Sequence, residues 1–177
     1  MASQPALQRL KGHFAESGNT PEAWSALWEQ DFKPWERSTS SPALIDALKS
    51  HATLQGGLRT NGTRKKALVP GCGTGHDVIV LADAGYDAVG LDGADLAIEA
   101  GVKLAEEHKQ ELGKNGGSAK FVKADFFASE WEKDADALSG FDLIYDYTVS
   151  QLTRSSWFML ILVVPVCFES IYASCLG

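Results

Sequence analysis

The sequence predicts an α/β protein with a mostly parallel, doubly wound sheet, and two patterns support that fold class. From Lys66 onward, short apolar runs of strand type alternate with stretches of helical spacing. The first run leads into a turn with three glycines, as in a strand–turn–helix unit. Strands that alternate with helices form parallel sheets with helices on both faces. With 177 residues, 45% of them hydrophobic, a single soluble domain is expected.

The chain before Lys66 is predicted to contain helices joined by loops. Residues 1–20 are expected to form a flexible arm with only a short helical pattern around residues 5–10. A side-chain cap followed by proline and an acidic residue predicts a helix over residues 20–30. A second helix, over residues 41–50, opens with a Ser-Pro pair.

Strands and helices then alternate. Strands are predicted over residues 66–70, 88–92, 119–125 and 141–147, with helices over 77–84, 95–112 and a stretch that ends near 138. Glycines follow the first two of these helices and end them.

Composition excludes several classes of function. With 23 acidic and 16 basic residues the formal charge is −7, so nucleic acid is not an expected partner. Three scattered cysteines, without a Cys-x-x-Cys pair, predict no disulfide scaffold and no metal site. The start of the chain lacks a secretory signal, which favours the cytoplasm. The apolar run over residues 157–168 would cover about 18 Å of a roughly 30 Å membrane core, so a buried strand or an apolar tail is preferred to a membrane helix.

The glycine turn after the first strand is the first candidate binding element. Gly71, Gly73 and Gly75 let backbone approach a ligand closely, and the helix that follows points its N-terminal amides at the turn. Taken alone, the same glycines are also compatible with an ordinary tight turn.

Asp92, at the end of the second predicted strand, strengthens the binding interpretation. A carboxylate at this place can accept both hydroxyls of a ribose held over the first turn. The turn reads G-x-G-x-G after Pro70, whereas a dinucleotide cradle requires G-x-G-x-x-G. Adenosine without a pyrophosphate fits better, which points to S-adenosylmethionine. The alternative for Asp92 is a solvated carboxylate in the Asp-Gly turn.

Three further residues follow strands of the same predicted sheet. The carboxyl ends of neighbouring parallel strands face one crevice, so Asp125 can accept from an adenine amino group while Phe126 stacks nearby. Asp125 is equally well explained as a helix N-cap. Tyr147 would reach the same crevice, or be an ordinary half-buried strand tyrosine.

Three tryptophans near the start could cover that crevice. Trp24 and Trp28 are four residues apart and share a helix face, and Trp35 lies on the following turn. Aromatic residues at helical spacing are commonly core residues. A sulfonium cofactor favours a second interpretation, because aromatic faces attract a cation and exclude water.

Five motifs in order, WSALWEQDFKPWE, ALVPGCGTGHDV, VGLDGADLAI, KADFF and FDLIYDYT, resemble the thiopurine S-methyltransferase superfamily, in particular its thiol and halide/thiocyanate methyltransferases. The resemblance runs from about Trp24 to Thr148. It implies a Rossmann-like methyltransferase sheet and methyl transfer from S-adenosylmethionine to a small thiol, thiocyanate or halide. It also implies cofactor contacts at the matching positions, which are Trp24, Trp28, Trp35, Gly71, Asp92, Asp125, Phe126 and Tyr147.

No catalytic acid or base is assigned, because an in-line displacement by a thiolate or anion needs mainly orientation and desolvation. Asp146 is the nearest candidate for proton handling, and a structural carboxylate is the preferred interpretation. We expect a monomer.

The resemblance stops at Thr148, so we expect a methyltransferase domain over residues 21–148 and an unrelated tail over 149–177. The sheet is therefore expected to be incomplete at the C-terminus. One hypothesis for the tail is a retained intron, because Val149-Ser150 can be encoded by a splice-donor pattern. Two other functions stay open: a non-catalytic remnant that only binds the cofactor, and a nicotinamide-dependent oxidoreductase.

Overall fold

The computed structural model describes residues 3–112, 114–128, 131–135, 140–147 and 160–166. Its helices are α1 Gln4–Ser17, α2 Pro21–Glu29, α3 Pro42–Ser50, the 3₁₀ turn η1 Ala52–Leu54, α4 His76–Asp83, α5 Asp95–Glu107, α6 Lys109–Leu112 and α7 Trp131–Asp134. Its strands are β1 Lys66–Pro70, β2 Asp87–Asp92, β3 Ser118–Lys123, β4 Phe141–Asp146 and β5 Leu160–Val166.

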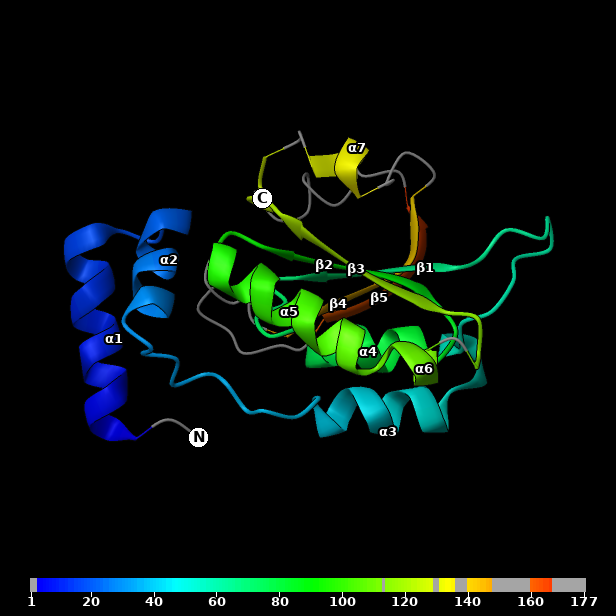
Figure 1. The fold of residues 1–177 in the computed structure, drawn as a ribbon, viewed down its shortest axis with the longest axis horizontal. Coiled ribbons are helices and arrows are strands. Elements are labelled where there is room, and N and C mark those ends of the chain that lie inside the picture. Colours follow the sequence, from blue (N-terminus) through cyan, green and yellow to red (C-terminus); the bar gives the residue numbers. More distant parts are fainter. Residues whose placement is uncertain (1–2, 113, 129–130, 136–139, 148–159, 167–177) are drawn as a thin grey trace.

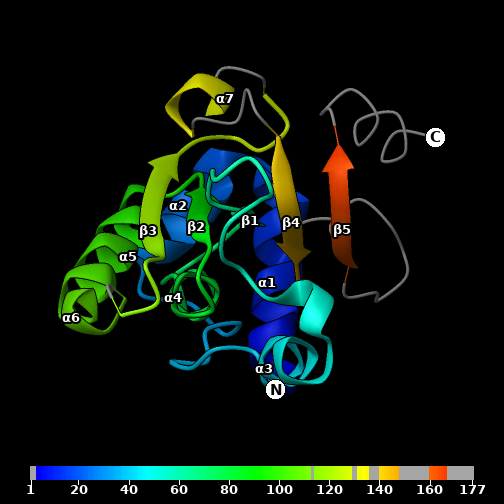
Figure 2. The ribbon, with the colours of Figure 1, turned by 90° about the vertical axis from the view of Figure 1, so that its right-hand side faces the viewer.

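The strands form one sheet in the order β3-β2-β1-β4-β5, which Figure 2 shows side by side. β1 runs parallel to β2 and β4, and β2 runs parallel to β3. The chain therefore winds outward from β1 in one direction and then returns to its other side, which places a topological switch point between β1 and β4. This is a Rossmann-like α/β arrangement, and the predicted fold class is confirmed.

The fifth strand lies within the apolar run for which a buried strand or a tail was expected. β5 pairs with β4 in the antiparallel direction, from Asp146 opposite Leu160 to Phe141 opposite Val166. Pro165 lacks a backbone N–H, and strand prolines are tolerated at sheet edges. The rest of the predicted 149–177 tail lies outside the described residues.

Two cores lie on opposite faces of the sheet because successive strand residues point to opposite sides. Ala67 and Val69 of β1 pack in one core with residues of α3 and α4, whereas Leu68 packs in the other with Trp131 of α7. Figure 1 shows α3, α4, α5 and α6 on one face and α7 on the other. The expected helices on both faces are confirmed.

The predicted helices agree with the structure except in three places. The helix predicted over 95–112 divides at His108, whose ring nitrogen Nδ1 lies 2.9 Å from the Leu104 carbonyl oxygen. Of the helical stretch predicted to reach residue 138, α7 is described, and residues 129–130 and 136–139 lie outside the described residues. The short pattern expected around residues 5–10 belongs to the longer helix α1.

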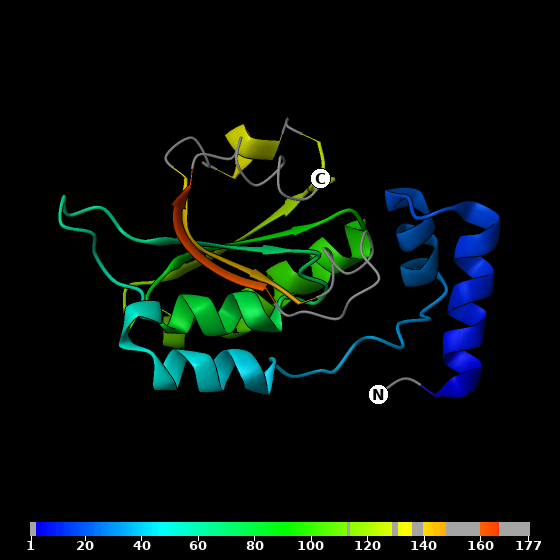
Figure 3. The ribbon, with the colours of Figure 1, turned by 180° about the vertical axis from the view of Figure 1, so that it is seen from behind.

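Helices α1 and α2 form a hairpin beyond the carboxyl ends of the parallel strands (Figure 3). His13 of α1 places its Nε2 atom 2.8 Å from the Ala23 carbonyl oxygen of α2. The Phe14 ring lies 4.6 Å from the Trp24 ring, between centroids. Thr20 caps α2 by accepting from the Ala23 amide, as the sequence predicted. These contacts fix the two helices to each other.

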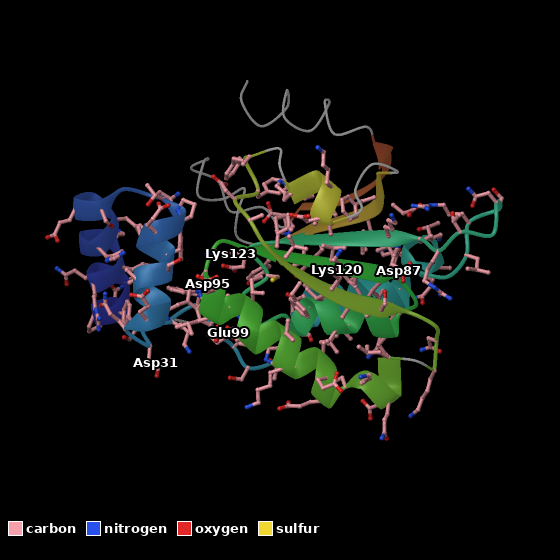
Figure 4. All side chains as sticks on the ribbon, turned by 45° about the horizontal axis from the view of Figure 1, so that its top comes forward. Asp31, Asp87, Asp95, Glu99, Lys120 and Lys123 are labelled. Carbon is pink, nitrogen blue, oxygen red and sulfur yellow. The ribbon has the colours of Figure 1, made fainter. Side chains whose placement is uncertain are left out.

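The edge strand β3 carries Lys120 and Lys123, which Figure 4 labels together with Asp87 of β2 and Asp95 of α5. Lys123 pairs with Asp95 of α5 at 2.7 Å, and Ser118 donates to Asp87 of β2 at 2.7 Å. Lys120 donates to the Asp134 carbonyl of α7. Lysines on an edge strand oppose pairing with another chain, so this edge is protected against aggregation.

We expect Gly75→Ala to destabilise the protein more than Gly57→Ala. Both glycines have positive φ, 86° and 99°, but a Cβ atom on Gly75 would overlap the Phe121 ring, whereas one on Gly57 would meet nothing within 4 Å. The backbone strain is thus shared, and the overlap should cost Gly75→Ala about 1–3 kcal/mol more. Urea unfolding measures both variants. Equal losses would show that Phe121 moves aside freely.

We expect Asp142→Asn to lower stability at pH 7 by about 1–3 kcal/mol and much less at pH 3. Asp142 accepts from Arg59 Nε at 3.0 Å, from Arg59 Nη2 at 2.6 Å and from the Lys66 amide at 2.7 Å. Burial opposes ionisation, yet these bonds hold the pKa of Asp142 below its ordinary value. The stabilisation is therefore present above the unfolded pKa and lost as pH falls below about 4 through the folded pKa.

Urea unfolding at the two pH values tests this expectation. Asp46→Asn, at an exposed position of α3, is the matched control for loss of one carboxylate. If the stability of Asp142→Asn falls between pH 7 and pH 3 as steeply as that of the unmodified protein, the result contradicts this role of the Asp142 carboxylate.

Candidate donor-binding site

The candidate site lies at the carboxyl ends of the parallel strands, next to the switch point between β1 and β4. The glycine turn joins β1 to α4, and its three glycines have left-handed φ values of 57° at Gly71, 55° at Gly73 and 86° at Gly75. Glycine adopts such values more readily than any residue with a side chain. The Cys72 amide donates to the Leu91 carbonyl of β2 at 2.8 Å, which fixes the turn to the neighbouring strand.

Asp92 joins this turn to the start of α5. Its Oδ2 accepts from the Gly73 amide at 2.9 Å, and its Oδ1 accepts from the Ala94 amide at 3.0 Å. Burial raises the pKa of Asp92, and these backbone hydrogen bonds partly offset that effect. Each carboxylate oxygen can accept a second hydrogen bond, so the bridging role leaves acceptor capacity for a ligand.

Two glycines of the β2 region allow close approach. A Cβ atom on Gly90 would lie 2.8 Å from Cys72 Sγ, so the strand needs glycine where the turn packs on it. A Cβ atom on Gly93 would lie 3.1 Å from Pro21 Cβ, the first residue of α2. Ser25 of α2 also donates to the Gly93 carbonyl at 3.5 Å. The helical hairpin therefore rests directly on the corner that follows Asp92.

The structure brings the three predicted tryptophans close to one another, and Trp28 lies beside the glycine turn. Trp28 is 6% exposed and packs against Ala94 and Ala97, with Trp35 against the same cluster. A Cβ atom on Gly73 would lie 3.9 Å from Trp28 Cζ2. The Trp24 ring lies 5.1 Å from the Trp35 ring, edge to face. Trp28 is therefore a packed residue that also lies beside Gly73 of the glycine turn.

Two charged residues that sequence reasoning missed also meet the site. Glu36 Oε1 accepts from Thr74 Oγ1, in the glycine turn, at 3.0 Å. Arg37 Nη2 donates to the Tyr147 hydroxyl at 2.7 Å, and the Arg37 guanidinium lies 5.0 Å from the centre of the Tyr147 ring. The sequence offered one signal for these two residues: Glu36 and Arg37 directly follow Trp35, in the segment expected to cover the crevice.

The residues after β4 lie near the same segment. Tyr147 is half-buried, and Asp146 is 5% exposed at the last position of β4. Burial raises the pKa of Tyr145 to about 12. Asp146 is enclosed by protein, and its structural interpretation stays a prediction.

Asp125 and Phe126 diverge in the structure. Asp125 is exposed, and its Oδ1 accepts from the Phe127 amide at 2.9 Å, so it caps its own turn. The Ala124 amide donates to the Asp92 carbonyl at 2.9 Å, which places Asp125 close to Asp92. The Phe126 ring is stacked with that of Trp131, 6.0 Å between centroids, in the core under α7.

A pocket of about 200 Å³ opens beside Asp125. Its lining residues come from the end of β3 and from α7: Lys123, Ala124, Asp125, Ala128, Trp131 and Asp134. The lining combines an indole, two carboxylates and the ammonium group of Lys123. Within the described part of the chain, no helix is long and apolar enough to cross a bilayer.

Two plant methyltransferases are among the known proteins that are similar in sequence to this chain. Thiocyanate methyltransferase 1 of Brassica oleracea is 35% identical over 131 residues, which cover 71% of this chain and 47% of that protein. The probable thiol methyltransferase 2 of Arabidopsis thaliana is 35% identical over 136 residues, which cover 77% of this chain and 51% of that protein. The chain spans about half the length of these curated relatives.

Among solved structures, an RNA methyltransferase from Salinibacter ruber in complex with S-adenosyl-L-homocysteine aligns with a TM-score of 0.45 and 19% identity, over 66% of this chain and 64% of that one. The family model for thiopurine S-methyltransferase matches residues 19–152, which include the helical hairpin's second helix, the glycine turn, Asp92 and all four parallel strands. The chain therefore belongs to the thiopurine S-methyltransferase family.

Proposed function

We propose that this protein binds S-adenosylmethionine and transfers its methyl group to a small thiol, thiocyanate or halide. Family membership and the names of the two plant relatives support this proposal. The residues at the carboxyl ends of the strands support it independently, because they fit the parts of the donor one by one.

The adenosine end fits the groups around Asp92. We propose that the Asp92 carboxylate accepts from the ribose hydroxyls through its remaining lone pairs, while Gly71 and Gly73 allow close approach of the backbone. The adenine would then reach Asp125 and the adjacent pocket. Phe126 would contribute a wall through its stacking with Trp131, and Tyr147 would close the side next to β4.

The carboxylate of Glu36 is the observation that best separates this donor from a nicotinamide dinucleotide. It lies on the glycine turn, hydrogen-bonded to Thr74, at the place where a pyrophosphate would need positive charge or free amides. A second negative charge there repels a pyrophosphate. S-adenosylmethionine carries no phosphate, so this objection does not apply to it.

The indoles suit the reacting end of the donor. When bound, S-adenosylmethionine supplies a methyl group activated by the positive charge of its sulfonium. Trp28 and Trp35 would present aromatic faces to a cation, an attraction of about 0.5–2 kcal/mol, and with Trp24 would exclude water. A thiolate or anionic acceptor needs no general base, so we assign no catalytic residue.

The α1–α2 hairpin is proposed to cover this site, and only α1 of that hairpin lies within the N-terminal arm predicted over residues 1–20. The acidic balance of the chain supports a small-molecule acceptor and no nucleic acid partner. We further propose that the protein acts in the cytoplasm as a monomer.

A second candidate is a donor-binding protein without activity. The chain spans about half the length of its relatives, whereas the residues proposed to bind the donor all lie within the matched region. Calorimetry with S-adenosylhomocysteine, with NAD⁺ as the control ligand, tests binding, and a thiol methylation assay tests turnover. Binding with turnover supports the first candidate and binding alone the second. Binding of NAD⁺ in place of S-adenosylhomocysteine would overturn both.

We expect Asp92→Ala to weaken S-adenosylhomocysteine binding by about 1–3 kcal/mol, because the ribose acceptor is lost and the Gly73 and Ala94 amides are left without a partner. Calorimetry on folded protein measures the effect. Asp46→Ala is the matched control, since Asp46 is an exposed carboxylate of α3. Unchanged affinity would mean that Asp92 is only a turn residue.

We expect Trp28→Leu to weaken S-adenosylmethionine binding more than S-adenosylhomocysteine binding. Only the methylated form carries a positive sulfur, so loss of the aromatic face should add about 0.5–2 kcal/mol for that ligand alone. Phe32→Leu, which removes a nearby ring that contacts Arg9, should not separate the two ligands. Equal weakening of both, or global unfolding, would favour a packing role for Trp28.

A further inference from the structure

The glycine turn is covered by a carboxylate of the protein itself. Glu36 Oε1 accepts from Thr74 Oγ1 at 3.0 Å and from the amides of Arg37 and Ser38 at 3.1 and 3.2 Å. Glu36 Oε2 lies on the side of Gly73, 3.7 Å from the position of a Cβ atom there. Among the described residues, this second oxygen accepts no hydrogen bond. One oxygen therefore anchors the carboxylate, and the other faces the turn.

Among the described residues, the Glu36 carboxylate is not paired with a basic side chain. The basic side chains of its own segment have other partners: Lys33 pairs with Asp31 at 2.7 Å, with its Nζ 5.0 Å from the centre of the Trp28 ring, and Arg37 donates to the Tyr147 hydroxyl at 2.7 Å. Within the described parts of the chain, no lysine, arginine or histidine forms an ion pair with Glu36. A negative charge held by three donors but lacking a cation suits a positively charged ligand group.

Gly73 is the point at which three proposed donor contacts meet. Its amide donates to Asp92, and its open side faces both Trp28 and Glu36. A ligand with its ribose on Asp92 and its sulfonium beside Trp28 would bring its amino-acid end to the same glycine. That end carries an ammonium group, which an unpaired carboxylate recognises by charge-assisted hydrogen bonds.

We propose that Glu36, oriented by Thr74, binds the α-ammonium group of the methyl donor. This inference rests on the proposed function and extends it, because it assigns the recognition of the amino-acid end to a residue outside the sheet. It also assigns a role to the segment between α2 and α3, which brings a specificity-determining charge to the site.

Calorimetry with Glu36→Gln tests the proposal through two ligands. S-adenosylhomocysteine has the ammonium group, and 5′-deoxy-5′-methylthioadenosine keeps the adenosine and sulfur without the amino-acid end. We expect the variant to bind S-adenosylhomocysteine about tenfold or more weaker and methylthioadenosine within about twofold of the unmodified protein. Glu29→Gln, an exposed position at the end of α2, is the charge-matched control and should change neither.

A second measurement varies the ligand in place of the protein. Removal of the amino group from S-adenosylhomocysteine should weaken its binding to the unmodified protein by a similar factor. The deaminated ligand should then bind the folded Glu36→Gln variant and the unmodified protein with the same affinity. Equal binding of the amino and deaminated ligands to the unmodified protein would overturn the proposal.

Three other outcomes of these measurements would also decide whether Glu36 binds the ammonium group. Tighter binding of S-adenosylhomocysteine to Glu36→Gln would show that the carboxylate competes with the ligand's own carboxylate, which contradicts the proposal. If the variant binds both ligands more weakly by the same factor, Glu36 only shapes the glycine turn, and this result also contradicts the proposal. Absence of S-adenosylhomocysteine binding to the unmodified protein would instead refute the proposed function, and methylthioadenosine binding would still report on the adenosine site.

Discussion

The Asp92 carboxylate is the interaction on which the candidate site depends. It accepts from the amide of Gly73 in one turn and from that of Ala94 in the next, so it ties the β1–α4 connection to the β2–α5 connection. A buried carboxylate is costly without such donors, and here the backbone supplies them. Trp28 and Glu36 both lie against Gly73, so their positions follow from the same bridge.

The strands and the first helices could be predicted because their signals are local. Thr20 and Pro21 begin α2 through a side-chain cap and a fixed φ, and β1 is an apolar run that glycines end. The break at His108 could not be predicted, because the spacing of apolar residues continues through it and Leu112 is buried on the far side. The antiparallel direction of β5 could not be predicted either, because an apolar run does not indicate in which direction a strand pairs.

The candidate site was partly predictable for a topological reason. Carboxyl ends of parallel strands meet at one edge, which brings Asp92 and Asp125 near each other whatever the intervening helices do. Phe126 departs from this rule because adjacent residues leaving a strand point to different sides, and its ring stacks with Trp131. Glu36 and Thr74 are far apart in sequence, and only the path of the chain between α2 and α3 brings them together.

The contact between Gly93 and Pro21 sets how closely α2 approaches the carboxyl ends of the strands. Pro21 begins the helix that carries Trp24 and Trp28, and it rests on a residue without a side chain in the corner after Asp92. A Cβ atom at position 93 would lie 3.1 Å from Pro21 Cβ, so the start of α2 would have to shift by a few tenths of an ångström to accept it. The spacing between the indoles of α2 and the strand ends therefore depends on the absence of a side chain at position 93.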